Sequence, residues 1–421
     1  MAVYLLSGYT FWRGTIDDGT IHVTTTFFIT GGTGFLGAAF IKQASIRQAS
    51  IRQASIRQAS ENRDVRFYCL VRGGHPSLSV ADRLRRALEN VGVVYDPSRH
   101  IAVEGDIEQP GFGIAEDLAE RIASKTNYVL HMAAMVSFLQ SYDELKQINV
   151  GGTQNAVSFA QRCHDTNQHF VRFGHVGTAY VAGRRSGRVS EDDLTDIHGF
   201  KNDYERTKFE AEQSVRENWA LLPTTIFRPS IIIGPAETSR MPVDVDAGQT
   251  LQPSLKLLLS GDYKYAPLNP DCSMDFIPVD DVARAIAGLL ETASGPSRAF
   301  HLVSGGKYPY TLETYKNIVN DEYEHLAAPV RFVDPKAYDR HIQPALDREN
   351  PRFAQIVSLF DRAYKPYLME NPVFDDVQTQ HALNRAGVAL SDPAVAFRNI
   401  LRRAARASAS ANGNRQVACA N

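Results

Sequence analysis

The stretch Thr25-Thr-Phe-Phe-Ile-Thr-Gly-Gly-Thr-Gly-Phe-Leu-Gly37 decides the fold of this chain. Its first six residues are mostly β-branched or aromatic, which predicts a strand over 25–30. Gly31, Gly34 and Gly37 follow with GxxGxxG spacing, and a helical pattern comes next. Glycine at these places permits a tight turn, a close approach of backbone N–H groups to a pyrophosphate, and close packing of the helix on the strand. The stretch therefore predicts a dinucleotide-binding turn.

Strand and helix patterns alternate after this turn. A helix is expected to include 83–88, and further strands are expected at 65–71, 100–103, 127–131, 170–173 and 224–227. Strands separated by helices predict an α/β fold with a doubly wound parallel Rossmann sheet. We expect a smaller, mostly helical C-terminal substrate domain beside it.

These patterns suggest a division of the chain into parts. The expected parts are an N-terminal extension without an assigned role (1–24), an NADP-binding Rossmann domain (25–235), a substrate domain (236–404) from which 275–304 returns to the Rossmann sheet, and a disordered tail rich in Ala, Ser and Asn (405–421).

Composition and charge limit the classes of function. The 421 residues carry 45 Lys and Arg against 47 Asp and Glu, so a net charge of −2 gives no electrostatic reason to expect a nucleic-acid partner. Cys69, Cys163, Cys272 and Cys419 are scattered and form no CxxC pair, which favours a reducing compartment over disulfides or a metal site. No apolar run reaches the roughly 18 residues of a transmembrane helix, and no signal peptide is evident. We expect a cytoplasmic protein without a bound metal.

A repeated pentad interrupts the first strand–helix–strand unit. IKQAS at 41–45 is followed by three copies of IRQAS at 46–60, which we interpret as a tandem insertion. Five residues advance a helix by about 500°, so successive isoleucines lie about 140° apart and make no single apolar seam. Fifteen helical residues add about 22 Å, whereas 61–64 span about 14 Å at most. The surplus must therefore protrude, loop out or distort the unit.

The residue at the tip of the second strand indicates whether NAD or NADP binds. In dinucleotide-binding folds this position, about 20 residues past the glycines, carries an acidic residue that binds the ribose of NAD. When the insertion is left out, the equivalent position here is Arg72. A guanidinium there pairs bidentately with a 2′-phosphate, so we expect NADP(H), with Arg83 as a second donor. The alternative is that Arg72 is an ordinary exposed arginine.

Other cofactor contacts are expected along the same edge of the sheet. Asp106 is placed to hydrogen-bond the adenine amine, and Ala133 keeps the side chain small where the cofactor crosses the sheet edge, although a small residue could equally serve packing. The complete set of expected cofactor-binding residues is Gly31, Thr33, Gly34, Phe35, Leu36, Gly37, Arg72, Arg83, Asp106, Ile107, Ala133 and Lys208.

Three side chains form a catalytic candidate. Tyr204 and Lys208 lie at i and i+4 on one face of an expected helix. A phenol has a pKa near 10, and a neighbouring ammonium together with the nicotinamide charge favours phenolate and lowers that pKa. Thr178 supplies a hydroxyl that could orient a substrate carbonyl beside Tyr204. Each feature alone is common, as a solvated helix face or a strand end, but together with the glycine turn they predict catalysis.

Ten motifs extend this pattern over about 30 to 290. They are TGGTGFLG at 30–37, CLVRG at 69–73, RLRRAL at 83–88, GDIEQPGFGI at 105–114, HMAAMVSF at 131–138, NVGGT at 149–153, HVGTAYVAG at 175–183, NDYERTKFEAE at 202–212, FRPSIIIGP at 227–235 and DFIPVDDVARAI at 275–286. In these motifs the chain resembles the extended short-chain dehydrogenase/reductases, and most closely their thioester-reductase and fatty acyl-CoA reductase branch of the male sterility type.

The resemblance implies NADPH-dependent reduction of an acyl thioester, on CoA or a carrier protein, through Thr178, Tyr204 and Lys208. Tyr204 would donate a proton as hydride reaches the carbonyl, and the hemithioacetal would collapse to an aldehyde and a thiol. Some relatives reduce the aldehyde further to an alcohol. Gly177 departs from the family pattern, because relatives usually carry Ser there.

Substrate recognition is expected in 236–270 and 305–400. Residues 251–259, Leu-Gln-Pro-Ser-Leu-Lys-Leu-Leu-Leu, could line an acyl channel, although apolar residues at helical spacing more often belong to a core. The segments 364–368 and 374–376 are loosely similar to the C-terminal region of acyl reductases.

Two other functions stay open. An extended reductase or epimerase acting on a ketone or a nucleotide sugar would use the same three catalytic residues. Arg72 argues against epimerases, which commonly keep NAD bound and carry an acidic residue at that strand tip. A non-catalytic dinucleotide-binding redox sensor is the third reading, and the intact Tyr204 and Lys208 weigh against it.

Overall fold

The structure, a computed structural model, describes residues 15–17, 20–56, 61–237, 264–292, 295–323, 329–369 and 371–404. Seven parallel strands form its central sheet, in the order β4-β3-β2-β5-β6-β8-β12. They are β2 (Thr20–Thr30), β3 (Glu61–Val71), β4 (His100–Glu104), β5 (Tyr128–His131), β6 (Arg172–Val176), β8 (Thr224–Pro229) and β12 (Arg298–Leu302). This order confirms the doubly wound Rossmann sheet.

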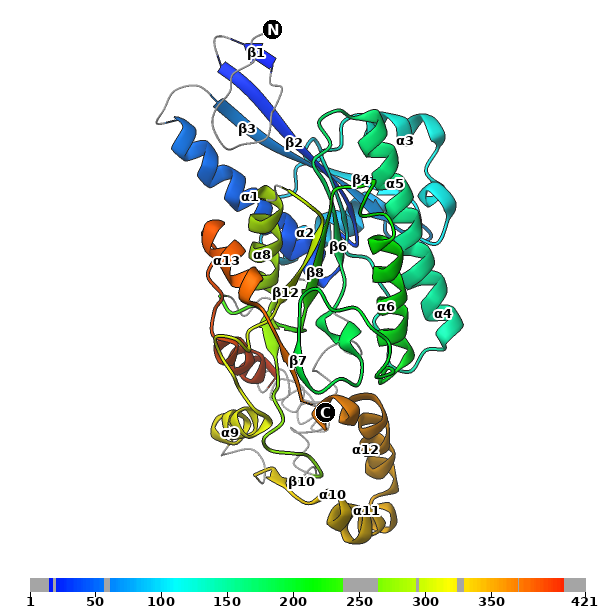
Figure 1. Ribbon diagram of the computed structural model, residues 1–421, viewed down its shortest axis with the longest axis vertical. Helices are drawn as coiled ribbons and strands as arrows, with labels where there is room; N and C mark the ends of the chain where they lie inside the picture. The colour runs from blue at the N-terminus through cyan, green and yellow to red at the C-terminus, as the bar shows by residue number, and fades with distance from the viewer. Residues whose placement is uncertain are drawn as a thin grey trace, which may run out of the picture.

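Helices cover both faces of the sheet (Figure 1). One face carries α1 (Phe35–Ile56), α2 (Val80–Asn90), α8 (Val279–Glu291) and α13 (Val377–Arg385), and the other carries α3 (Glu116–Ala123), α5 (Gly152–Thr166) and α6 (Asp203–Arg216). Within β2, Phe27 and Ile29 belong to the core on the first side and Phe28 to the core on the second. Because successive strand side chains point to opposite faces, a strand covered on both faces needs a continuous apolar run.

The repeated pentads extend one corner of the molecule. α1 continues through the repeats to Ile56, and β2 and β3 project beside it beyond the rest of the sheet (Figure 1). The 22-residue helix and the 11-residue strand β3 have matching lengths of about 33 and 36 Å. β2 starts at Thr20 rather than at the expected residue 25, pairs Ile21 with Glu61, and carries the short antiparallel β1 (Thr15–Asp17). Of the three outcomes expected for the surplus, the structure therefore shows protrusion.

The chain beyond β8 builds a second unit, which lies below the sheet in Figure 1. Its elements are β9 (Ile231–Ile233), β10 (Tyr265–Ala266), β11 (Phe276–Pro278), α9 (Leu312–Glu322), β13 (Arg331–Phe332), α10 (Pro335–Ala337), η4 (Tyr338–Ile342), α11 (Gln343–Glu349), α12 (Pro351–Tyr364) and η5 (Lys365–Leu368). It has its own apolar core, which includes Phe276, Tyr315 and Phe397. α8 and β12 lie between β11 and α9 in the chain but pack with the Rossmann unit.

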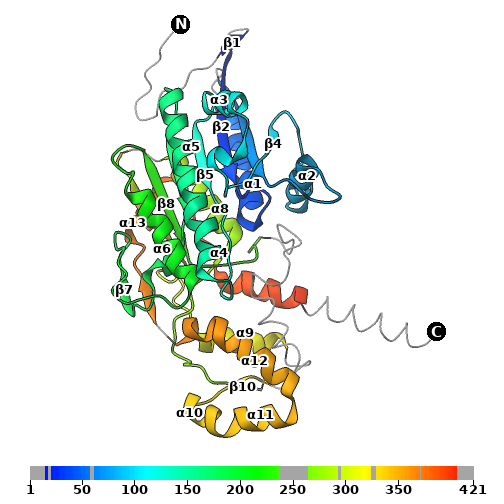
Figure 2. The same ribbon diagram turned by 90° about the vertical axis from the view of Figure 1, so that its right-hand side faces the viewer.

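Two short strands join the units. β7 (Gly187–Val189) lies in the loop before α6, and β14 (Pro372–Phe374) pairs with it in parallel. Figure 2 shows the second unit stacked along the long axis of the molecule, beyond the end of the sheet that carries α4 (Tyr142–Lys146).

Several sequence expectations concern residues outside the described ranges, namely 251–259, 405–421 and Cys419. The three cysteines that lie within the described ranges, Cys69, Cys163 and Cys272, are buried. Within those ranges, no helix combines the length and apolar character needed to cross a membrane.

Candidate active site

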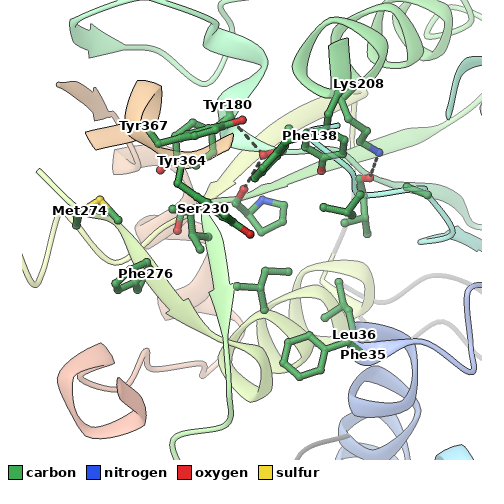
Figure 3. A pocket seen from close by; sticks show the side chains of 18 of the residues that line it. Phe35, Leu36, Phe138, Tyr180, Lys208, Ser230, Met274, Phe276, Tyr364 and Tyr367 are labelled. Carbon is green, nitrogen blue, oxygen red and sulfur yellow. Dashed lines mark hydrogen bonds between the residues drawn. The ribbon is translucent and has the colours of Figure 1, made fainter. Parts of the chain in front are cut away.

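A cavity of about 720 Å³ lies between the Rossmann unit and the second unit. Doubly wound sheets bind ligands outside the carboxyl ends of their strands, which is where this cavity begins. Phe35 and Leu36 lie at one side of it, and Met274 and Phe276 lie at the other (Figure 3). The site residues predicted from the sequence that line it are Gly31, Thr33, Gly34, Phe35, Leu36, Gly37, Arg72, Ile107, Ala133, Thr178, Tyr204 and Lys208.

The glycine turn has the shape that a pyrophosphate requires. Gly31 has a φ of 77°, in the left-handed region that favours glycine, and its carbonyl oxygen accepts a hydrogen bond from Gly34 N at 2.9 Å. A Cβ atom on Gly37 would lie only 2.1 Å from that carbonyl oxygen. α1 begins at Phe35, so the N–H groups of its first turn lie at the cavity wall. These residues fit a bound dinucleotide.

Arg72 lies at the rim of the cavity, with 58% of its side chain exposed. Its Nε is 3.5 Å from Asp106 Oδ2, and its Nη2 is 3.9 Å from Glu108 Oε1. The Arg83 guanidinium donates to the carbonyl oxygen of Arg72. Arg83 and Asp106 are therefore grouped around Arg72 rather than in the lining that the described residues form, whereas Ile107 lies in that lining.

Thr178, Tyr204 and Lys208 come from two neighbouring elements. Thr178 follows β6 and caps the short helix η3 (Ala179–Ala182); its Oγ1 donates to the Pro229 carbonyl oxygen at 3.4 Å. Tyr204 and Lys208 belong to α6, whose start is fixed by the Asn202 side chain, which accepts from Glu205 N at 2.9 Å. All three catalytic candidates line the same cavity as the glycine turn.

Burial controls the protonation of the two ionisable candidates. Lys208 is only 2% exposed and donates to the Val176 carbonyl oxygen at 2.9 Å, and its burial lowers its pKa from 10.5 to about 8. Burial, followed by the charge of Glu205, raises the pKa of Tyr204 above its ordinary value of 10. In the surroundings that this chain alone provides, the pKa of Tyr204 thus shifts opposite to the lowering expected from the lysine and the nicotinamide charge together, because desolvation disfavours the phenolate.

Two histidine side chains, His131 and His175, lie close enough to Lys208 to feel its charge. His131 and His175 are buried and stacked, with ring centroids 5.7 Å apart. Burial and then the charge of Lys208 lower the pKa of both rings, that of His131 to about 3. Thr30 Oγ1 and Thr153 Oγ1 lie 2.7 and 3.2 Å from the two nitrogen atoms of His131. Both rings are therefore neutral at physiological pH and add no positive charge beside Lys208.

Sequence reasoning missed an aromatic group at the centre of the cavity. Phe138, Tyr180, Tyr364 and Tyr367 all line it, and Figure 3 shows them close together. Phe138 ends the HMAAMVSF motif, and Tyr364 and Tyr367 lie in 364–368. Both segments stand out in the sequence, each for its own motif. Their contact joins segments far apart in the chain, and neither segment contains a local signal of the other.

Beyond these rings the cavity is lined by the core of the second unit. The lining residues that also belong to this core are Ala266, Leu268, Met274, Phe276, Leu312, Tyr315, Val319, Val330, Leu368 and Phe397. One cavity thus joins a dinucleotide-shaped turn, three candidate catalytic side chains and an apolar chamber.

Comparison with known proteins identifies related sequences. Residues 29–286 match an NAD-binding family model described as "Male sterility protein". The nonribosomal peptide synthetase asaC of Aspergillus flavus is 29% identical over 66% of this chain and 26% of its own length. The fatty acyl-CoA reductase wat of Drosophila melanogaster is 33% identical over 34% of this chain and 31% of its own length. The chain therefore spans about a quarter to a third of the length of these relatives.

A solved structure shows the same fold. The terminal R domain from the myxalamid PKS-NRPS biosynthetic pathway superimposes with a TM-score of 0.70, at 24% identity, over 91% of each chain. The agreement covers the Rossmann unit and the second unit together.

Proposed function

The chain belongs to the male sterility protein family, and on this premise we propose that it is an NADPH-dependent reductase of acyl thioesters. The thioester would be carried on CoA or on a carrier protein, and the product would be an aldehyde or an alcohol. The observation that carries the proposal is the single cavity in which the glycine turn, Thr178, Tyr204, Lys208 and the apolar chamber meet.

The cofactor side of the proposal rests on the glycine turn and Arg72. The turn would hold the pyrophosphate at the start of α1, and the Arg72 guanidinium would pair with the 2′-phosphate that distinguishes NADPH from NADH. Arg72 is exposed at the rim, so a phosphate can reach it without a change in the core. When bound, the reduced nicotinamide supplies a hydride to the carbonyl carbon of the thioester.

Tyr204 would supply the proton in this reaction. Its raised pKa keeps the phenol protonated at neutral pH, as a proton donor to the carbonyl oxygen must be. Thr178 would hold the carbonyl oxygen in place through its hydroxyl. Lys208, which holds its proton below a pH of about 8, would stabilise the phenolate that Tyr204 leaves behind. The hemithioacetal that results would break its C–S bond and release the thiol and an aldehyde.

The substrate side rests on the apolar chamber and on the relatives. A chamber lined by core side chains such as Leu312, Val319 and Phe397 favours an acyl chain over a sugar, whose hydroxyl groups would need hydrogen-bond partners. The named relatives include a fatty acyl-CoA reductase and a peptide synthetase. Both names are consistent with an acyl group as the substrate.

The decisive experiment follows NADPH oxidation by absorbance with three kinds of substrate: acyl-CoA thioesters, a ketone and a UDP-sugar. We expect oxidation with the thioesters and release of one thiol for each acyl group. Tyr204→Phe should lower turnover by about 100-fold or more and change NADPH affinity by less than about twofold. Tyr265→Phe, at an exposed tyrosine of β10, is the matched control and should change neither. Oxidation with only the ketone or the UDP-sugar would refute the proposed substrate class.

A further inference from the structure

Phe138 contacts both the candidate proton donor and two tyrosines of the second unit. It lies in the loop between β5 and α4, and its ring lines the cavity. The centroid of its ring is 5.8 Å from that of Tyr204, with the planes inclined by 66°. An inclined, edge-on arrangement of this kind is one that aromatic rings prefer, so it favours one orientation of the neighbouring ring.

The opposite side of Phe138 faces rings of the second unit. Its centroid is 5.6 Å from that of Tyr364, at the end of α12, and 5.3 Å from that of Tyr367, in η5. Tyr367 in turn packs edge-on against Tyr180, with ring centroids 5.1 Å apart. Asn202 Nδ2 donates a hydrogen bond to the hydroxyl oxygen of Tyr367 at 2.9 Å. Figure 3 shows Phe138 between these tyrosines and Lys208.

The loop that carries Phe138 is tied to α6, the helix of Tyr204. The Asn149 side chain accepts a hydrogen bond from Met135 N at 2.8 Å and donates to the Met135 carbonyl oxygen at 3.1 Å. The same amide donates to Thr207 Oγ1 in α6 at 3.2 Å. The main chain near Phe138 is thus held in a fixed relation to the helix, so the ring contact with Tyr204 is built into the fold.

We infer that Phe138 is a positioning residue: its ring holds the Tyr204 phenol in the plane from which the hydroxyl reaches the substrate carbonyl, and it transmits the packing of Tyr364 and Tyr367 to that phenol. Tyr364 and Tyr367 also line the cavity. An acyl chain packed against these two tyrosines would therefore affect the position of Phe138, which contacts both, and through it the position of Tyr204. Correct filling of the chamber would therefore favour the productive orientation of the proton donor. This inference rests on the proposed function of Tyr204.

The test uses Phe138→Leu, which removes the ring but keeps most of the apolar volume, and Phe138→Tyr, which keeps the ring. In single-turnover reactions with an acyl-CoA, we expect Phe138→Leu to lower the rate by about tenfold or more, because small misplacements of a reacting group are costly. Phe138→Tyr should keep at least about half of the rate, and NADPH affinity should change by less than about twofold in both. Leu139→Ala, at the exposed neighbour in the same loop, is the control and should behave like the wild type.

The same substitution made in the Tyr204→Phe variant distinguishes a positioning role of Phe138 from a general loss of structure. If Phe138 acts through the phenol, Phe138→Leu should have almost no further effect on the residual rate of Tyr204→Phe, so the two changes should be strongly non-additive. Full additivity, or a Phe138→Leu rate equal to that of Leu139→Ala, would overturn the inference while the wild type still reduces thioesters. A wild-type chain that reduces no thioester would overturn the proposed function and this inference together.

Discussion

Lys208 and Tyr204 lie one helical turn apart in α6, and burial moves their pKa values in opposite directions. The sequence spacing revealed that the two side chains are neighbours, but it contained no measure of how far each is removed from water. Desolvation penalises the ammonium of Lys208 and the phenolate of Tyr204 alike, so both shifts favour the neutral form. At neutral pH Tyr204 is therefore protonated and Lys208 is still mostly charged.

This pair predicts how activity depends on pH. The pKa of Lys208 is about 8, so its ammonium is present below that pH and is lost as the pH rises through it. Because the ammonium would stabilise the developing phenolate in the proposed reaction, kcat/KM for the thioester should fall by about tenfold for each pH unit above about 8. Lys208→Arg should be slower but should show no fall in this range, since a guanidinium keeps its charge. A wild-type profile that stays flat to about pH 10 would exclude this role.

Arg72 provides the second prediction at the scale of single residues. Arg72→Asp would remove the donor for a 2′-phosphate and place a third carboxylate beside Asp106 and Glu108. We expect the Kd of NADPH to rise by about 100-fold, in line with the loss of a charged hydrogen bond and added repulsion, and that of NADH by less than about threefold. Fluorescence titration of both dinucleotides measures this.

The matched control is Arg86→Asp, which makes the same charge change at an exposed position of α2. Its effect on either Kd should stay within about twofold at physiological salt, because Arg86 is outside the cavity lining formed by the described residues and salt screens exposed charges. If the two variants weaken NADPH binding equally, the affinity is set by net charge and not by a specific contact with the phosphate.

Elements that repeat a local pattern were predictable, and elements defined by a distant partner were not. The strands at 100–103, 127–131 and 224–227 are found within two residues of their expected ends because apolar runs bounded by turn residues mark them. The polar segment 61–64 has no such pattern. It is a strand only because it pairs with 21–24 of the lengthened β2, a contact that no short window of sequence reveals.

The first half of α1 is the part that packs against the rest of the molecule. Ile41 is fully buried and Ala44 is 5% exposed, whereas Ile46 is 50% exposed. Arg47, in the first IRQAS copy, donates to Glu291 and, at 2.9 Å, to the Ala386 carbonyl oxygen. The contacts described for α1 thus concentrate in its first half, together with Arg47.

Deletion of 51–60, two of the repeated pentads, should therefore have little effect. We expect unchanged NADPH affinity, because the glycine turn lies at the other end of α1, and a smaller loss in the free energy of unfolding by urea titration than a buried substitution causes, because the contacts described for α1 concentrate in its first half. Ile41→Ala in the same helix should cost about 2–5 kcal/mol as a buried large-to-small change. Comparable losses in the two variants would show that the projecting pentads contribute to the fold.

At the scale of the whole molecule, the candidate site depends on how two units are joined. That the glycine turn and the three catalytic candidates line one cavity could be predicted, because each lies in a local motif. The apolar chamber could not be predicted, since its walls come from segments that meet only after folding. The two units are joined in part by the β7–β14 pairing. Next to β7 lies Glu191, which is 1% exposed and ties this segment to β12 and to α13, the helix that follows β14. Glu191 accepts hydrogen bonds from the backbone N–H groups of His301, Gln378 and Thr379, each at 3.2 Å.

Glu191→Ala tests whether this junction holds the site together. The change leaves the buried N–H groups of His301 and Thr379 and the part-buried N–H group of Gln378 without their acceptor. Each buried loss costs about 1–3 kcal/mol, so the free energy of unfolding should fall by about 2 kcal/mol or more. Because η5, with Tyr367, directly precedes β14, turnover should fall as well, although Glu191 is outside the lining formed by the described residues. Urea titration and NADPH oxidation measure the two effects.

Arg188→Ala gives the control at the same junction. Arg188 pairs with Asp375 at 2.7 Å, but 72% of its side chain is exposed, and such surface ion pairs contribute about 0–1 kcal/mol. The contrast between the two variants follows from burial, since water can replace the partner of Asp375, whereas the N–H groups of His301 and Thr379 that Glu191 accepts from are buried. If Glu191→Ala lowered stability yet left turnover unchanged, the second unit would keep the chamber in place without this junction.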